Sequence, residues 1–92
     1  MYMVVERFKN GDAAPVYRRL RTEGRGATEG LHYRGSWVDR RLNQCFQLME
    51  TDDRALLDAW IEHWSDLVDF EVVEVMSSEE ASGRFPAESA DG

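Results

Sequence analysis

The sequence predicts an α+β fold, a ferredoxin-like βαββαβ sandwich in which a four-stranded antiparallel sheet carries two helices on one face. Two observations predict it. Segments of strand and helix character follow one another over residues 1–76 in the order strand, helix, strand, strand, helix, strand. Each segment also has the length and hydrophobic period of its type. Because two helices cover only one face of four strands, the other face stays bare, and we expect a homodimer that covers it.

The first strand is predicted at Tyr2–Phe8, which is rich in valine and aromatic residues and is followed by an Asn-Gly turn. A helix then extends to about Glu23, with Asp12 at the N-cap and Pro15 in the first turn. The apolar residues of this helix form a single stripe: Val16, Tyr17 and Leu20.

The middle of the chain reads as a loop followed by a hairpin. Residues 24–30 are glycine-rich and lack periodicity, which indicates a loop. Strands are predicted at Leu31–Val38 and Gln44–Glu50, and the polar turn Asp39–Asn43 joins them.

The second helix has the clearest pattern in the chain. Thr51 or Asp52 is expected to cap it, and Asp53 in its first turn complements the helix dipole. Its buried stripe is expected to contain Leu56, Leu57, Trp60, Ile61 and Trp64. The last strand is predicted at Asp69–Met76, which completes a domain over residues 1–76. Residues 77–92 are acidic and poor in hydrophobic residues, so we expect a disordered tail.

Composition excludes several classes of function. The net charge of −7 argues against nucleic acid as a partner, because phosphate binding relies on Lys and Arg. No apolar run is long enough to span a membrane, and no signal peptide is recognisable. A single cysteine, Cys45, suits a reducing cytoplasm. Charge is uneven, +3 over residues 1–50 and −10 over residues 51–92. This asymmetry fits solvated helix faces, or else pairing between subunits or an anion near the arginines Arg18, Arg19, Arg21 and Arg25.

Polar residues within the predicted strands are the candidates for chemistry. Glu6 and Gln47 lie on the two strands expected at the centre of the sheet. A buried Glu6 must either form an ion pair with Arg34 or Arg7, or titrate at a raised pKa and act as a general base. His32 is a second candidate base, and Arg34 a candidate for stabilising an enolate.

Aromatic and polar side chains near these groups are the candidate ligand-binding residues: Trp37, Gln47, Glu50, Trp60 and Trp64. Trp60 and Trp64 fit a plain hydrophobic core at least as well as a pocket wall. His32, His63 and Cys45 do not have the spacing of metal ligands, so neither a metal nor another cofactor is expected.

Several blocks of the sequence resemble a family of bacterial proteins of unknown function, DUF3303. The blocks include the opening Met-Val-Val-Glu-Arg-Phe, Gly30-Leu31-His32-Tyr33, the Cys45–Glu50 segment, and the segment from Trp60 through Trp64 to Val73. The resemblance covers residues 1–76. It implies the fold of the dimeric α+β barrel group, which includes cofactor-free monooxygenases and isomerases, and it implies a dimer but no specific reaction.

Three functions fit these observations. The first is binding of a small organic molecule without catalysis. The second is cofactor-free oxygenation or isomerisation of a flat, activated organic substrate. The third is a purely structural interaction module that uses the charge asymmetry. A cavity of several hundred Å³ lined by Glu6, Arg34 and Gln47 favours the first two, and a solid aromatic core favours the third.

Overall fold

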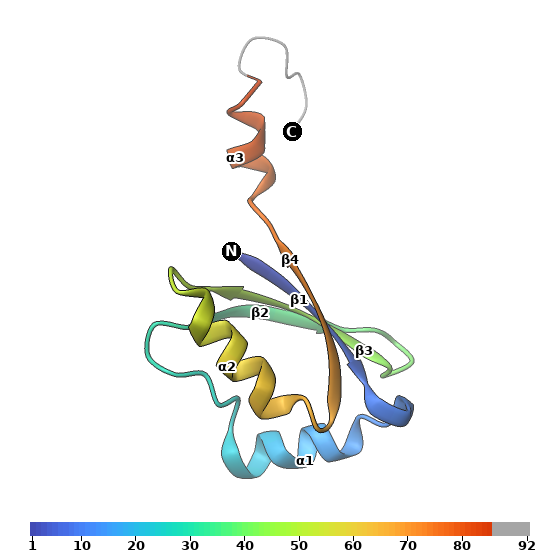
Figure 1. The fold of residues 1–92 in the computed structure, drawn as a ribbon. Helices are drawn as coiled ribbons and strands as arrows, with labels where there is room; N and C mark the ends of the chain where they lie inside the picture. The colour runs from blue at the N-terminus through green and yellow to red at the C-terminus, as the bar shows by residue number, and fades with distance from the viewer. Residues whose placement is uncertain (86–92) are drawn as a thin grey trace.

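A computed structural model describes residues 1–85 of the chain, which form one α+β domain with a four-stranded antiparallel sheet (Figure 1). The elements, in chain order, are β1 (Tyr2–Phe8), the 3₁₀ turn η1 (Lys9–Gly11), α1 (Ala14–Glu23), β2 (His32–Val38), β3 (Gln44–Glu50), α2 (Arg54–Trp64), β4 (Val68–Glu74) and α3 (Ser78–Ser82). The predicted element order is therefore confirmed over β1 to β4.

The sheet has the strand order β2-β3-β1-β4, and every neighbouring pair is antiparallel. The two central strands are β1 and β3, as the sequence predicts. In the register of the sheet, Glu6 of β1 lies between Cys45 of β3 and Phe70 of β4. Because alternate residues of a strand point to opposite faces, Val4, Glu6 and Phe8 share one face of β1.

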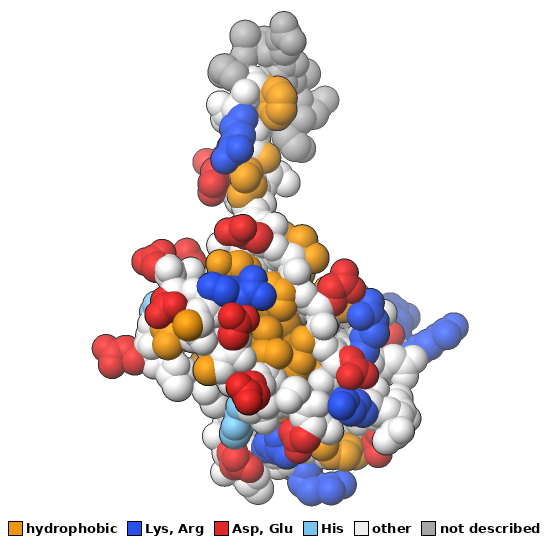
Figure 2. Space-filling model, in the orientation of Figure 1, with side chains coloured by type: hydrophobic (Ala, Val, Ile, Leu, Met, Phe, Trp, Pro, Cys, Tyr) orange, Lys and Arg blue, Asp and Glu red, His pale blue; other side chains and the backbone are white. Residues whose placement is uncertain are grey.

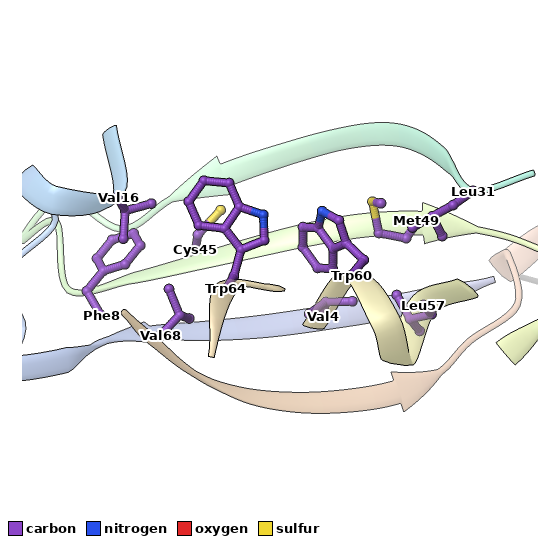
Figure 3. Close-up of a cluster of buried hydrophobic side chains, with 10 residues drawn as sticks. All are labelled: Val4, Phe8, Val16, Leu31, Cys45, Met49, Leu57, Trp60, Trp64 and Val68. Carbon is purple, nitrogen blue, oxygen red and sulfur yellow. The ribbon is translucent and has the colours of Figure 1, made fainter. Parts of the chain in front are cut away.

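Both helices cover that same face of the sheet (Figure 1). Val16 of α1 and the α2 residues Leu57, Trp60 and Trp64 join one hydrophobic core with Val4 and Phe8. The remaining buried members come from the strands and from the loop before β2: Leu31, Cys45, Met49 and Val68. Figure 3 shows the two indole rings extending from α2 across the sheet, with the Trp64 nitrogen on the side that faces Trp60.

The helix caps differ from the sequence prediction. Asp53, and not Thr51 or Asp52, is the N-cap of α2, and its side chain accepts a hydrogen bond from the Ala55 N–H. Ala13 occupies the N-cap position of α1. Asp12, the residue before it, accepts a hydrogen bond through Oδ1 from the N–H of Ala14, the first residue of the helix. In both places an Asp side chain satisfies a free N–H of the first helical turn, so the residue type was right and its position was not.

A β-bulge in β2 changes which side chains face the helices. The register shifts between Tyr33, which lies opposite Met49, and Gly35, which lies opposite Leu48. Because the extra residue reverses the alternation, Tyr33 lies on the helix-covered face while Trp37 lies on the open face. Trp37 is 60% exposed there and lies apart from the pocket residues described below, so its role in ligand binding stays a prediction.

The C-terminal segment leaves the body of the domain after β4. Val75 still donates its N–H to the Met1 carbonyl, at 2.8 Å. The chain then forms the short helix α3, capped by the Ser77 hydroxyl, which stands away from the sheet in Figure 1. The predicted disordered tail thus contains a helical turn in its described part. Its last residues, 86–92, lie outside the described residues.

The surface carries charges of both signs around apolar areas. Figure 2 shows hydrophobic side chains exposed between α2 and β4, with acidic and basic groups around them. Ile61, Phe70 and Val72 from these elements are only partly buried against the core. Within residues 1–85, no helix has both the length and the apolar character needed to cross a membrane.

Candidate functional site

Glu6 is the most unusual residue of the sheet because its carboxyl group is buried in the core. The residue is only 7% exposed, and its Oε2 atom has no hydrogen-bond partner among residues 1–85. Burial disfavours the charged carboxylate, and this raises the pKa of Glu6 from its ordinary 4.5 to about 7. Glu6 is therefore close to half protonated at neutral pH, and one of its buried oxygens has no hydrogen-bond partner within the described part of the chain.

The loop after α1 brings an arginine, Arg25, into the same pocket as this carboxyl group. Gly24 and Gly26 on either side of Arg25 have φ of 72° and 77°, a left-handed conformation that glycine adopts without strain. The Arg25 carbonyl accepts hydrogen bonds from two indole N–H groups, Trp60 Nε1 at 2.8 Å and Trp64 Nε1 at 2.9 Å. Two bonds from the core thus fix the Arg25 backbone, while its side chain extends beyond it.

The Arg25 side chain contacts two neighbours on the sheet. Its guanidinium carbon lies 3.7 Å from the centre of the Tyr33 ring, within the range of a cation–π contact. Its Nη1 donates to Gln47 Oε1 at 3.3 Å. The positive charge also lowers the pKa of Glu6, although burial has the larger effect. The remaining N–H groups of the guanidinium have no bond to Glu6.

These groups line a pocket of about 50 Å³ between the sheet and the helices. Its polar lining consists of Glu6, Tyr17, Arg25, Ser36, Cys45 and Gln47, and its apolar lining of Phe8, Val16, Leu20, Val38, Trp60 and Trp64. All strands but β4, both large helices and the Arg25 loop contribute to it. The pocket opens to solvent on one side, so small molecules can reach Glu6.

Two further titratable groups face Glu6, and both stay neutral. Burial, together with the neighbouring Glu6 charge, raises the pKa of the Cys45 thiol to about 11. The pKa of the Tyr17 hydroxyl is also raised. Burial has the largest effect, and the nearby Cys45 and Glu6 groups raise the pKa further. Cys45 is therefore no thiolate nucleophile at neutral pH, and the pocket has only two groups with formal charge, Glu6 and Arg25.

The structure brings together some of the predicted site residues. Glu6, Gln47, Trp60 and Trp64 share the pocket, and Gln47 is only 2% exposed, with its amide N–H donating to Met49 Sδ. The two tryptophans serve as core and pocket wall at once, so the two interpretations of them do not exclude each other.

The other candidates lie elsewhere. His32, Arg34 and Glu50 line a separate, open cleft of about 350 Å³ at the N-terminal end of α2. Arg34 forms its ion pair with Glu50 at 2.7 Å, and not with Glu6. The second suggested partner, Arg7, pairs with Glu71 at 3.1 Å. The predicted ion pair of Glu6 with Arg34 or Arg7 is therefore wrong, and Glu6 has a raised pKa instead.

Sequence reasoning missed Arg25 as the charged neighbour of Glu6 in the pocket, and it also missed the pocket positions of Tyr17 and Ser36. Arg25 was placed with three α1 arginines as a diffuse anion site. Its sequence context, Gly-Arg-Gly directly after a helix, is a signal that a loop can turn back over the sheet, and it could have singled out Arg25.

The site offers a proton acceptor, a cation and two aromatic walls, a set suited to binding or proton transfer on an organic molecule. No group of three or more His, Cys, Asp or Glu side chains in the described part of the chain could hold a metal ion.

Comparison with known proteins gives a family and no activity. No curated protein and no solved structure matches this chain. The family model described as "Domain of unknown function (DUF3303)" matches residues 1–87 of the 92-residue chain. The blocks that suggested this resemblance lie within the matched range, and the chain belongs to the DUF3303 family.

Proposed function

We propose that this protein binds a small organic molecule in the pocket formed by Glu6, Arg25 and Gln47. The observation that carries the proposal is the unpartnered Glu6 Oε2, which is buried beside a pocket open to solvent. A buried polar atom without a partner costs about 1–3 kcal/mol. A bound molecule that supplies the missing hydrogen bond would offset this cost.

The size of the pocket limits the ligand. A cavity of roughly 150 Å³ is needed to hold benzene. The pocket here measures about 50 Å³, well below the several hundred Å³ considered from the sequence. Only a small head group therefore fits as the side chains stand, and the rest of a larger molecule has to extend through the mouth or displace the Arg25 side chain.

The indole N–H signals of the protein offer a direct test. Trp60 and Trp64 donate to the Arg25 carbonyl inside the pocket, whereas Trp37 lies on the opposite sheet face. In a ¹H–¹⁵N NMR screen of small organic fragments, binders should shift the Trp60 and Trp64 indole signals and leave Trp37 unchanged. Fragments that shift none of the three at millimolar concentration, across acids, amides, amines and alcohols, would refute the proposal.

Proton transfer on the bound molecule is the second candidate function, and the raised pKa of Glu6 favours it. A general base works best with a pKa close to the operating pH, and Glu6 has a pKa of about 7. Arg25 in the same pocket would stabilise the enolate that forms when Glu6 removes a proton beside a carbonyl group. Exchange of solvent deuterium into a bound ketone or ketoacid, and its loss in Glu6→Gln, would identify this activity.

Dimerisation through the open sheet face is a further part of the proposal. The strand order β2-β3-β1-β4 is that of ferredoxin-like domains, and a second copy on the open face would form a dimeric α+β barrel. Support comes from apolar side chains on that face, which include Met3, Val5, Trp37, Phe46, Leu48 and Val73. Arg7 and Glu71 on the same face are each 55% exposed and could pair across a two-fold axis. Analytical ultracentrifugation should show a dimer for the wild type and a monomer near 10.6 kDa for Phe46→Glu; a monomeric wild type would refute it.

A further inference from the structure

The charges and hydrogen-bond donors of the Glu6 pocket specify the kind of molecule that fits it. Only Glu6 and Arg25 among its lining residues carry a formal charge. Burial favours the neutral carboxylic acid form of Glu6, while Arg25 is always protonated. With Glu6 protonated, the pocket has a net charge of +1 and lies between apolar walls. A ligand with one negative charge neutralises it, whereas a cation would be repelled by Arg25.

The hydrogen-bonding groups lead to the same class of ligand. Protonated Glu6 is a donor, and Arg25 keeps several N–H donors beyond the one that it gives to Gln47. The Gln47 carbonyl is already used by Arg25, and its amide group donates only to the weak acceptor Met49 Sδ. A head group with two acceptor oxygens and no donor satisfies these groups, and a carboxylate has that form.

We infer that the ligand is a small organic monoanion, such as a short-chain carboxylate, whose head group lies between Arg25 and the Glu6 carboxyl group in this pocket. This inference rests on the proposed binding function and specifies its ligand class. The apolar stem of the ligand would lie against the indoles of Trp60 and Trp64. Binding would include uptake of one proton by Glu6, since an ionised Glu6 would repel the carboxylate.

The pH dependence of binding then follows from Glu6 alone. The titratable groups that face it are Arg25 from the loop, Tyr17 from α1 and Cys45 from β3. From α2 it meets the indoles of the pocket wall, and from β4 its register neighbour is Phe70, none of which titrate. Tyr17 and Cys45 have raised pKa values and stay protonated between pH 6 and pH 8, and Arg25 stays charged.

Butyrate and its neutral isostere butyramide test the inference in the same NMR titration. We expect butyrate to bind at least about tenfold more tightly than butyramide at pH 6, and to weaken about tenfold from pH 6 to pH 8 as one proton is lost. Butyramide binding should not change over that range. Glu6→Gln, which mimics the protonated acid, should bind butyrate with an affinity independent of pH.

Two matched substitutions separate the pocket from general effects of charge. Arg25→Gln should abolish the preference for butyrate, whereas Arg21→Gln on the exposed side of α1 should keep it. Glu50→Gln, the same change at an exposed carboxylate, should keep the wild-type pH dependence. Butyramide binding as tightly as butyrate, or butyrate binding that does not weaken towards pH 8, would overturn the ligand class and leave the binding function standing. If neither compound shifts the Trp60 and Trp64 signals while an amine or alcohol fragment does, the ligand class fails and the binding function stands; if no fragment of any class shifts them, both fail.

Discussion

Glu6 and Glu50 lie on the two central strands of the same sheet, and each has an arginine close by, yet their environments are opposite. The Glu50 side chain is about half exposed and forms a 2.7 Å ion pair with Arg34. Glu6 is buried, and the guanidinium of Arg25 bonds to Gln47 and stacks on Tyr33 instead of closing on the carboxyl group.

This difference shows which of the two carboxyl groups can gain hydrogen bonds from a ligand. In the cleft beside Glu50 the charges neutralise each other in water, so a ligand gains little by replacing them. In the pocket the burial of Glu6 costs free energy that a ligand with complementary groups can recover. The larger cleft, of about 350 Å³, is therefore the weaker candidate, although its volume is greater.

The largest difference between the pocket and the cleft should appear in how much their lining residues contribute to the free energy of unfolding. Trp60→Ala should lower the free energy of unfolding by about 3–5 kcal/mol, because it removes a buried indole and its bond to the Arg25 carbonyl. Leu56→Ala, in the partly exposed wall of the cleft, should cost distinctly less. Urea denaturation of both variants measures this. Trp60→Phe should fall between wild type and Trp60→Ala, and equal losses at Trp60 and Leu56 would contradict the assignment of the core.

Glu6→Gln should make the protein more stable at neutral and alkaline pH. Because the pKa of Glu6 rises from 4.5 to about 7 on folding, the folded protein binds the proton more tightly than the unfolded chain. The stability from Glu6 is thus complete below about pH 4.5 and falls as the pH rises to about 7, by about 3 kcal/mol at most.

Chemical denaturation at several pH values checks this sign. Above pH 7, Glu6→Gln should exceed the wild type by about 1–3 kcal/mol, and the gain should vanish near pH 4.5. Glu50→Gln is the control and should show no such gain. A Glu6 carboxyl titration by NMR with a pKa near or below 4.5 would contradict the buried, unpaired state and remove Glu6 as a base.

Arg25→Gln should have an intermediate effect on stability and a distinct effect on titration. It removes the Tyr33 contact and one hydrogen bond, for a loss of about 1–2 kcal/mol, but it keeps the backbone carbonyl that Trp60 and Trp64 bind. Because Arg25 lowers the pKa of Glu6, its loss should raise that pKa further. NMR titration of Glu6 in the variant would show this, and an unchanged pKa would mean that the guanidinium lies too far away to act on it.

Arg34→Gln should have the smallest effect. The ion pair with Glu50 joins two half-exposed side chains, and such pairs contribute about 0–1 kcal/mol. Thermal unfolding at low and high salt should give melting temperatures close to the wild type. A clear loss that high salt removes would show that the cleft is more strongly coupled to the fold than its exposure suggests.

The sequence predicted much of the framework because local patterns define it. The bounds Tyr2–Phe8 and Gln44–Glu50 agree with β1 and β3, since both strands alternate and end at turn residues. The spacing of Leu56, Trp60 and Trp64 predicted the buried side of α2, on which Trp60 and Trp64 are buried and Leu56 is partly buried. The central strands of Glu6 and Gln47 were also predicted, whereas only the structure shows that both side chains face the helices and are buried.

The charged neighbour of Glu6 could not be predicted in the same way. The predicted strands suggested Arg34 or Arg7 as the ion-pair partner of Glu6. Each of these arginines instead pairs with another carboxylate, Arg34 with Glu50 and Arg7 with Glu71. Arg25 reaches the site from a loop whose position depends on two indole bonds formed in the packed core. The sheet face of Trp37 depends on the bulge in β2, where one extra residue reverses the alternation, and Gly35 is the local sequence signal for that bulge.

The sequence by itself thus determined the order of the elements, the central position of Glu6 and Gln47, and the two indoles above them, because hydrophobic period and turn residues act over a few neighbouring positions. Only the tertiary structure decided that Glu6 has no ion-pair partner and that Arg25 lies in the same pocket on an anchored loop. Those facts depend on which side chains meet across the sheet and helices, where contacts between distant residues compete and burial sets the cost of each charge.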